Sequence, residues 1–241
     1  MGKMRRRYGF GWTRGVTILI VVNVAFWLLE LLAFSGGATA GSSPLALVMH
    51  GLMLDPEAAL GRLQIWQLFT YMFLHDPHDP LHLFFNMFVL YMFGGLFERR
   101  WGTRVFLRFY LISGLIAGLV GALAGLIAPG LLGGTIVGAS GSLTALLMAF
   151  ALIFPEQQVQ LMFVMPIRGR QLVLALVALD LLMFLTGSHI AIAVHAGGLL
   201  AGWLLITGSW RWSRLRRLVA RSRGPHAQRR GRFKVYSNTR H

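Results

Sequence analysis

The chain has 241 residues, of which 56% are hydrophobic and 13% are charged, and its formal net charge is +15. Because soluble domains carry about 25% charged residues, these values exclude an ordinary soluble enzyme and a disordered chain, and they favour an integral membrane protein with its cations outside the lipid. The sequence has no cysteine, which excludes disulfides, thiol catalysis and thiolate metal sites.

A basic segment, 1–15, opens the chain, and an apolar run over 16–34 follows it. We expect a basic cytoplasmic N-terminus and then a retained membrane span, because the run is too long for a signal peptide and no convincing cleavage site follows it. The segment of about 35–80 is then an outer loop, which we expect to lie partly in the membrane interface.

Five further apolar runs follow the outer loop. A helix needs about 20 mostly apolar residues to cross about 30 Å of hydrocarbon, and shorter spans are tolerated inside a bundle. The sequence therefore predicts an all-α membrane domain over 16–208, built as a bundle of six transmembrane helices. The five runs cover about 81–97, 104–127, 138–154, 171–187 and 189–208. The remaining residues, 209–241, form a basic tail that we expect to be disordered and cytoplasmic.

Positive charge predicts the orientation of the spans. Of the 23 Lys and Arg residues, 22 fall on one side of the predicted membrane, and Arg62 in the outer loop is the exception. By the positive-inside rule both termini are cytoplasmic, which requires an even number of spans. We expect the basic tail to contact anionic lipid headgroups. We expect no nucleic-acid partner, since a nucleic-acid-binding domain would need a fold of its own.

Three polar residues on different spans lie at a common predicted depth. Counted at about 1.5 Å per residue, Ser140 lies about 22 Å from Pro155, His195 about 22 Å from Trp210 and His82 about 24 Å from Glu98, and these three residues are taken as the cytoplasmic ends of the spans. In a core of about 30 Å the side chains of Ser140, His195 and His82 share one layer near the outer face. Polar groups inside spans are costly and are therefore candidates for function.

A serine and a histidine at one depth favour nucleophilic catalysis. We predict Ser140 as the nucleophile and His195 as the base that takes its proton. Ser140 also lies at a predicted helix N-terminus, where free backbone N–H groups stabilise a developing oxyanion. His82 and Asn86 are four residues apart on one helix face, and both can donate to the same oxyanion.

Glycines near the two predicted catalytic residues indicate that their helices touch. Small residues at helical spacing let two backbones approach closely inside a membrane. Gly198 and Gly202 follow His195 on its helix face, and Gly138 and Gly141 flank Ser140. We expect these four glycines to bring Ser140 and His195 within reach of each other.

These residues resemble the rhomboid family of intramembrane serine proteases. The similarity runs from about residue 16 to 208 in the family's order. The matching stretches are WQLFTYMFLH at 66–75, HLFFNM at 82–87, ERRWG at 98–102, GASG at 138–141 and HAGGLLAG at 195–202.

The resemblance implies a Ser140–His195 dyad with no third acid, and we expect no cofactor. It implies an oxyanion hole formed by His82, Asn86 and the Ser140 N–H. It further implies that the protein cleaves peptide bonds in or near the transmembrane helices of other membrane proteins, with substrate entering past the fifth span. The six-span form resembles the simpler prokaryotic members, so the expected location is a prokaryotic plasma (inner) membrane.

The sequence departs from the family pattern at two positions. The family often has an aromatic residue four positions after the nucleophile, on which the catalytic histidine packs, and this chain has Thr144. The residue before the catalytic histidine is often alanine, and this chain has Val194, which we expect to crowd the site slightly. Neither departure removes a reacting group.

Several polar residues have plain structural interpretations. Ser140 could be an ordinary helix N-cap, and His195 could be a core histidine. Asp180 could complete a triad, but its predicted depth of about 14 Å puts it below the Ser140 layer, so a structural carboxyl is favoured. Glu30 is expected to reach the interface, and Glu98 is expected to pin a cytoplasmic turn.

A metal site is a further alternative for the histidines of the outer loop. His75, His78 and His82 lie close together in sequence with Asp76 and Asp79. The spacing lacks the His-Glu-x-x-His pattern, and two prolines interrupt any helix that would align the ligands. We therefore expect no metal.

Two other functions compete with proteolysis. A catalytically inactive rhomboid-like scaffold would bind membrane-protein clients without cutting them, and the Thr144 departure keeps this alternative open. A transporter would need inverted repeats and broken helices in both halves, and the sequence has neither. The sequence carries no signal for an oligomeric state.

Overall fold

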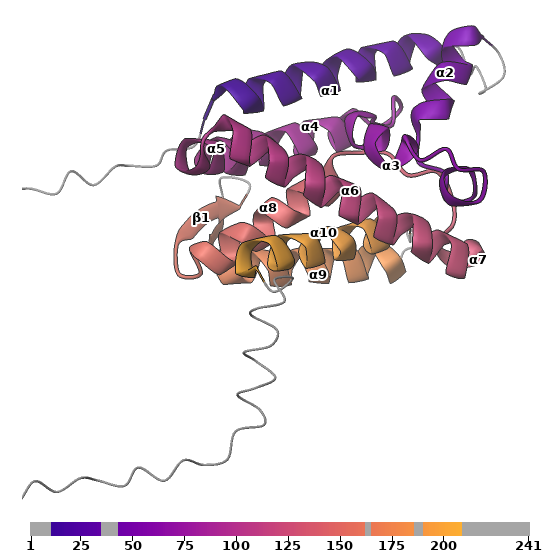
Figure 1. Ribbon diagram of the computed structural model, residues 1–241. Coiled ribbons are helices and arrows are strands. Elements are labelled where there is room, and N and C mark those ends of the chain that lie inside the picture. Colours follow the sequence, from indigo (N-terminus) through magenta and orange to yellow (C-terminus); the bar gives the residue numbers. More distant parts are fainter. Residues whose placement is uncertain (1–10, 35–42, 162–164, 186–189, 209–241) are drawn as a thin grey trace, which may run out of the picture. The chain divides into compact units, whose positions relative to one another are not determined.

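The computed structural model describes residues 11–34, 43–161, 165–185 and 190–208, and these are mostly helical (Figure 1). A helix coincides with each of the six apolar runs. The helices are α1 (Arg14–Ala33), the continuous helix formed by α4 (Pro80–Val89), a π-turn at η4 (Leu90–Gly94) and α5 (Gly95–Trp101), then α6 (Thr103–Ile127), α8 (Ser140–Ile153), α9 (Gly169–Leu185) and α10 (Ile190–Thr207). The tail over 209–241 lies outside the described residues.

Among the described residues, three helices are long and apolar enough to cross a membrane: α1, the helix over Pro80–Trp101, and α6. α8 is apolar and has 14 residues, and the apolar part of α10 over Ile192–Thr207 is also shorter than a full span. Helices of this length suit the interior of a bundle, where neighbouring helices surround them.

The short helix α8 lies at the centre of the bundle, in contact with α4, η4, α6, α9 and α10 (Figure 1). Small residues make this position possible. A Cβ placed on Gly197 of α10 would lie 2.9 Å from the backbone of Ala117 on α6, and a Cβ on Gly202 would lie 2.6 Å from the carbonyl oxygen of Ala145 on α8. Three helix backbones therefore meet with little side-chain volume between them.

The outer loop is folded into short helices. They are α2 (Pro44–Leu52), η2 (Glu57–Gly61), α3 (Gln67–Thr70) and η3 (Tyr71–Phe73), and α7 (Pro129–Leu132) lies at the same end of the bundle (Figure 1). Leu54 and Ile136 exchange both backbone hydrogen bonds, which joins this loop to the segment that leads into α8. The loop thus helps to position the start of α8.

The connection between α8 and α9 corrects the all-α prediction. It contains a small antiparallel hairpin, β1 (Gln158–Leu161) with β2 (Met165–Arg168), in which Val159 pairs with Ile167. Val159 and Ile167 are buried while Arg168 is exposed, which is the alternation of a strand with one covered face. A strand of four residues is too short for its alternation to be recognised within an apolar sequence.

Glu98, at the end of α5, joins the starts of two other helices. Its carboxylate accepts hydrogen bonds from the backbone N–H groups of Gly15 (2.8 Å) and Val16 (2.9 Å) and from the hydroxyls of Thr13 and Thr103. Glu98 therefore supplies acceptors for backbone N–H groups in the first turn of α1. Its bond to Thr103 holds the start of α6 beside that turn. This contact confirms that Glu98 pins a turn of the bundle.

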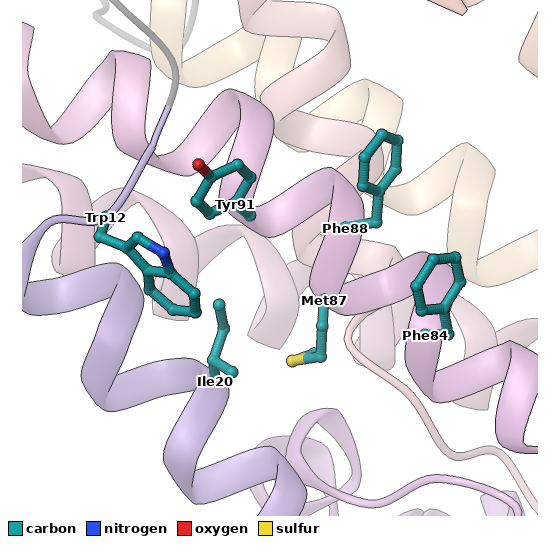
Figure 2. Close-up of a pocket in the computed structure, with 6 residues that line it drawn as sticks. All are labelled: Trp12, Ile20, Phe84, Met87, Phe88 and Tyr91. Carbon is teal, nitrogen blue, oxygen red and sulfur yellow. The ribbon is translucent and has the colours of Figure 1, made fainter. Parts of the chain in front are cut away.

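An open apolar groove of about 240 Å³ lies between α1 and the helix formed by α4 and η4 (Figure 2). α1 and the segment before it contribute Ile20 and Trp12 to the groove. The other lining residues are Phe84, Met87, Phe88 and Tyr91. Their spacing of three or four residues places them on one face of the helix, whereas Leu83, Asn86 and Leu90 lie buried in the bundle.

Candidate active site

Ser140 is the first residue of α8, and the chain enters this helix through a glycine in an unusual conformation. Gly138 has φ +118°, and its N–H donates to the carbonyl oxygen of Tyr71 at 3.0 Å. Ala139 occupies the N-cap position, so the interpretation of Ser140 as an ordinary N-cap is wrong. The N–H groups of Ser142 and Leu143 donate to the carbonyl oxygen of Ala139 at 3.0 and 3.1 Å, and the helix dipole adds positive potential at this first turn.

His82 lies directly against the segment that leads to Ser140. A Cβ placed on Gly138 would lie 2.8 Å from Nε2 of His82, so the imidazole occupies the space that a side chain at position 138 would fill. The glycine is required both for its positive φ and for this close approach. Nε2 of His82 thus lies against Gly138, the residue two positions before Ser140 in the chain.

Asn86 lies one helical turn after His82 and is buried. Its side-chain amide nitrogen donates to the carbonyl oxygen of His82 at 2.7 Å. A side-chain amide carries two N–H donors, and this bond engages one of them. The structure therefore places the Asn86 amide on the same helix face as His82.

α8 and α10 touch next to both predicted catalytic residues. A Cβ placed on Gly198 would overlap the carbonyl oxygen of Gly141 and the hydroxyl of Thr144. Gly198 is three residues after His195 and so lies on the same face of α10. The face of α10 that carries His195 is therefore pressed against the first turn of α8, as the glycine pattern predicts.

The His195 imidazole is hydrogen-bonded to Asp180 of α9. The distance between Nδ1 of His195 and Oδ1 of Asp180 is 2.7 Å, and Asp180 is 8% exposed. The prediction that Asp180 lies well below the catalytic layer is wrong. α10 ends at Thr207, three residues before Trp210, from which the predicted depth of His195 is counted. Measured from the observed helix ends, His195 lies at about 18 Å and Asp180 at about 16 Å.

Thr144 does not leave an empty space where the family often has an aromatic ring. Its hydroxyl donates to the carbonyl oxygen of Gly141 at 2.9 Å and lies 3.4 Å from the carbonyl oxygen of His195. Thr144 therefore contacts the backbone of the histidine. The predicted crowding by Val194 is avoided, because its side chain packs into the space that Gly121 and Gly141 leave by having no side chains.

Tyr71 supports the start of α8 from the outer loop, a role that the sequence pattern did not reveal. Its hydroxyl donates to the carbonyl oxygen of Gly114 on α6 at 2.8 Å and lies 3.0 Å from a Cβ placed on Gly141. Burial raises the pKa of Tyr71, so the hydroxyl remains a donor. A tyrosine within a run of apolar loop residues gives no local signal of such a contact.

The histidines of the outer loop lie in different environments. His75 is fully buried, and its backbone N–H donates to a carboxylate oxygen of Glu30 at 2.9 Å. Glu30 is itself buried, which corrects the expectation that it reaches the interface. His78 is exposed and pairs with Asp76. Among the described residues, no group of three or more His, Asp or Glu side chains is arranged to hold a metal ion.

Burial lowers the pKa of His75 to about 3, with a smaller contribution from the positive charge that His82 can carry. The two imidazole rings are neighbours, with centroids 5.0 Å apart. The imidazole of His75 is therefore uncharged at neutral pH, and it packs beside the ring of His82.

The chain is similar in sequence to a known protein family. The family model described as Rhomboid domain matches residues 62–212. The match includes every candidate site residue from His82 to Gly202, and it begins after α1. No curated protein matches the chain significantly.

Proposed function

The chain belongs to the rhomboid family, and from this membership and the site geometry we propose that it is an intramembrane serine endopeptidase. Its substrates are other membrane proteins, which it cleaves in or near their transmembrane segments. The observation that supports this function best is the contact of α8 with α10. At this contact the helix face that carries His195 meets the helix turn that begins with Ser140.

In the proposed reaction His195 takes the proton of the Ser140 hydroxyl at Nε2 while Oγ attacks the scissile carbonyl carbon. The tetrahedral intermediate collapses as the C–N bond breaks and the imidazolium gives its proton to the leaving amine. The same imidazole then activates a water molecule, which attacks the acyl-enzyme and releases Ser140. The reaction requires no cofactor.

The oxyanion of the intermediate is stabilised by three donors: the Ser140 N–H, the side chain of His82 and the Asn86 amide. The contact of His82 with Gly138 supports this role, since it places the imidazole beside the start of α8. The first turn of α8 adds its own N–H groups and dipole at the same point. Gly138, Gly141, Gly198 and Gly202 serve this site by allowing close packing.

We propose six membrane crossings with both termini in the cytoplasm of a prokaryotic cell. The arrangement of charges supports this topology. The end of α5 and the hairpin β1–β2 lie at one end of the bundle (Figure 1), where the Arg100 guanidinium lies 5.3 Å from the ring of Phe154. The short helices of the outer loop lie at the opposite end. The domain limits 16–208 and the contact of the tail, 209–241, with anionic headgroups belong to the same proposal.

A cleavage assay tests this function. The purified full-length protein is reconstituted in liposomes with a panel of single-span substrates, and cleavage is followed by electrophoresis. The expected result is cleavage of at least one substrate by the wild type and none by Ser140→Ala. Equal rates for the two proteins would show that Ser140 is not the nucleophile.

The Thr144 departure supports one alternative, an inactive scaffold that holds membrane-protein clients. A fluorophosphonate probe separates the two functions because it reacts only with an activated serine. A protease is labelled at Ser140, and the labelling is lost in His195→Ala. A scaffold is not labelled and still captures clients when Ser140 is replaced by alanine.

A further inference from the structure

The bond between Asp180 and His195 joins two different helices inside the bundle. α9 carries the carboxylate and α10 carries the imidazole, and the atoms Oδ1 and Nδ1 are 2.7 Å apart. This distance is that of a charge-assisted hydrogen bond. The side chains are 9% and 14% exposed, respectively, so little solvent competes for either group.

A buried acid in an apolar helix is costly unless a partner satisfies it. Asp180 is flanked on α9 by the exposed apolar residues Leu179 and Leu181, so its own helix offers no polar partner beside it. The partner is the ring that the proposed function uses as its base. The acid is therefore placed at the reacting group rather than at a polar surface of the protein.

The choice of ring nitrogen has a chemical consequence. An ionised carboxylate can only accept hydrogen bonds, so its contact with Nδ1 requires that Nδ1 carries the proton. The neutral imidazole then has its lone pair on Nε2, which is the atom that must take the proton of Ser140. The carboxylate thereby selects the tautomer that is competent as a base.

The surroundings of His195 make such an anchor necessary. In the family's usual pattern an aromatic residue packs on the catalytic ring, and at that position this chain has Thr144, which contacts the backbone carbonyl oxygen of His195 instead. A proton on His195 would also place a cation among apolar helices, which is costly without a counter-charge. Asp180 supplies both the orientation and the negative charge.

We propose that Asp180 is a positioning residue for His195, so that Ser140, His195 and Asp180 work as a triad within the membrane. This inference rests on the proposed function. When Oγ of Ser140 bonds to the scissile carbon, its proton moves to Nε2, and the imidazolium carries protons on both nitrogens. The Asp180 carboxylate accepts from Nδ1 throughout and stabilises that cation. The proton then leaves from Nε2 to the departing amine, and Nδ1 keeps its own.

Steady-state kinetics of three variants test the proposal in the full-length protein. Asp180→Asn keeps the size of the side chain and removes its charge, and we expect kcat to fall by about 10²- to 10⁴-fold with KM within about twofold. Asp180→Glu keeps the charge and is expected to recover a part of kcat. Glu156→Gln is the control, because it removes a carboxylate that pairs with Arg168 and Arg170 beside the start of α9 and does not contact His195.

The outcomes separate this proposal from the proposed function. If the wild type cleaves its substrate and Asp180→Asn has the same kcat, the positioning role is overturned and the protease function stands. If Asp180→Asn and Asp180→Glu lose kcat equally, charge is not what matters and the proposal also fails. If the wild type shows neither cleavage nor Ser140-dependent labelling, the proposed function itself fails.

A second measurement reads the protonation of His195 in the wild type itself. Nitrogen NMR of the wild type with ¹⁵N-labelled histidine reports which ring nitrogen of His195 is protonated, and His195→Gln assigns the signal. We expect the proton on Nδ1 at a pH where the ring is neutral. A proton on Nε2 instead would overturn the proposal, since the ring could not then accept the proton of Ser140.

Discussion

The rings of His75 and His82 lie with centroids 5.0 Å apart and planes tilted by 58°. His75 is buried in the folded outer loop, and both of its ring nitrogens lack a hydrogen-bond partner among the described residues. The neutral ring of His75 thus packs against one side of the His82 ring. On the side of α8, Gly138 has no side chain and leaves room for His82. The loop, the proposed oxyanion donor and the start of α8 therefore form one packed unit.

This packing predicts a loss of stability in acid. His75 has a pKa of about 3 in the fold and an ordinary value of 6.5. As the pH falls from 6.5 towards 3, the unfolded chain takes up a proton that the folded chain excludes. The free energy of unfolding then falls by at most about 1.4 kcal/mol per pH unit. Melting temperatures in detergent micelles between pH 7.5 and 4.5 measure this loss.

His75→Phe is the matched comparison, because it keeps a buried ring and removes the titrating group. Glu30 and the other acids titrate in both proteins, so the difference between the two pH curves isolates His75. We expect the wild type to lose more stability than His75→Phe over this range. Parallel curves would contradict the prediction.

Glu98→Ala is expected to destabilise the bundle strongly. The change removes the acceptor of four hydrogen bonds, two of which come from the first turn of α1. Leaving buried donors without an acceptor lowers the free energy of unfolding by about 3 kcal/mol or more. Glu156→Gln, at an exposed ion pair with Arg168, should change it by less than about 1 kcal/mol. Similar losses in the two variants would refute the special role of Glu98.

Gly198→Ala tests the contact between α8 and α10. The added methyl group would overlap the Gly141 carbonyl and the Thr144 hydroxyl, so the helices must separate. We expect stability to fall by about 1–3 kcal/mol and kcat to fall by about 100-fold, because the reacting groups lose their alignment. Substrate cleavage and thermal melting measure the two effects.

Gly51→Ala provides the control for this glycine substitution. Gly51 lies in the helix α2, and a Cβ added there meets no atom within 4 Å. We expect an unchanged kcat and a gain of up to about 1 kcal/mol from helix propensity. A wild-type kcat in Gly198→Ala would show that the close contact is not needed for the reaction.

Thr144→Val should separate the shape of Thr144 from its hydrogen bonds. Valine keeps the volume and loses the bonds to the Gly141 and His195 carbonyl oxygens. We expect a loss of about 1 kcal/mol in stability and a severalfold decrease in kcat. Thr144→Phe introduces the ring that the family often has, but Thr144 is buried against Gly198, so this variant should unfold at a lower temperature than Thr144→Val. The reverse order would contradict the packing described.

The helices of the bundle could be predicted from the sequence because each depends on a local run of apolar residues. The approach of α8 to α10 could also be predicted, since Gly141 and Gly198 are recognisable by their spacing from Ser140 and His195. The catalytic roles of Ser140 and His195 stay predictions. The helix ends were less predictable, and an error of three residues at the end of α10 displaced His195 by about 4–5 Å in depth.

Contacts that depend on the folded loop could not be predicted. The partner of Glu30 is a backbone N–H of His75, and the position of Tyr71 depends on how α3 and η3 turn beneath the bundle. No periodic pattern encodes either contact, because both arise from the path of an irregular segment. The hairpin β1–β2 was missed for a similar reason, since its strands are four residues long.

The bond between Asp180 and His195 makes the proposed reaction sensitive to small displacements of α9 relative to α10. A hydrogen bond of 2.7 Å is lost once its atoms separate beyond about 3.5 Å, so a relative shift of α9 and α10 by about 1 Å is enough to release the imidazole. Bilayer thickness and lateral pressure act on the tilt of such helices. In the proposed protease, the lipid composition around the protein would therefore act on the proposed base without any ligand binding at the site.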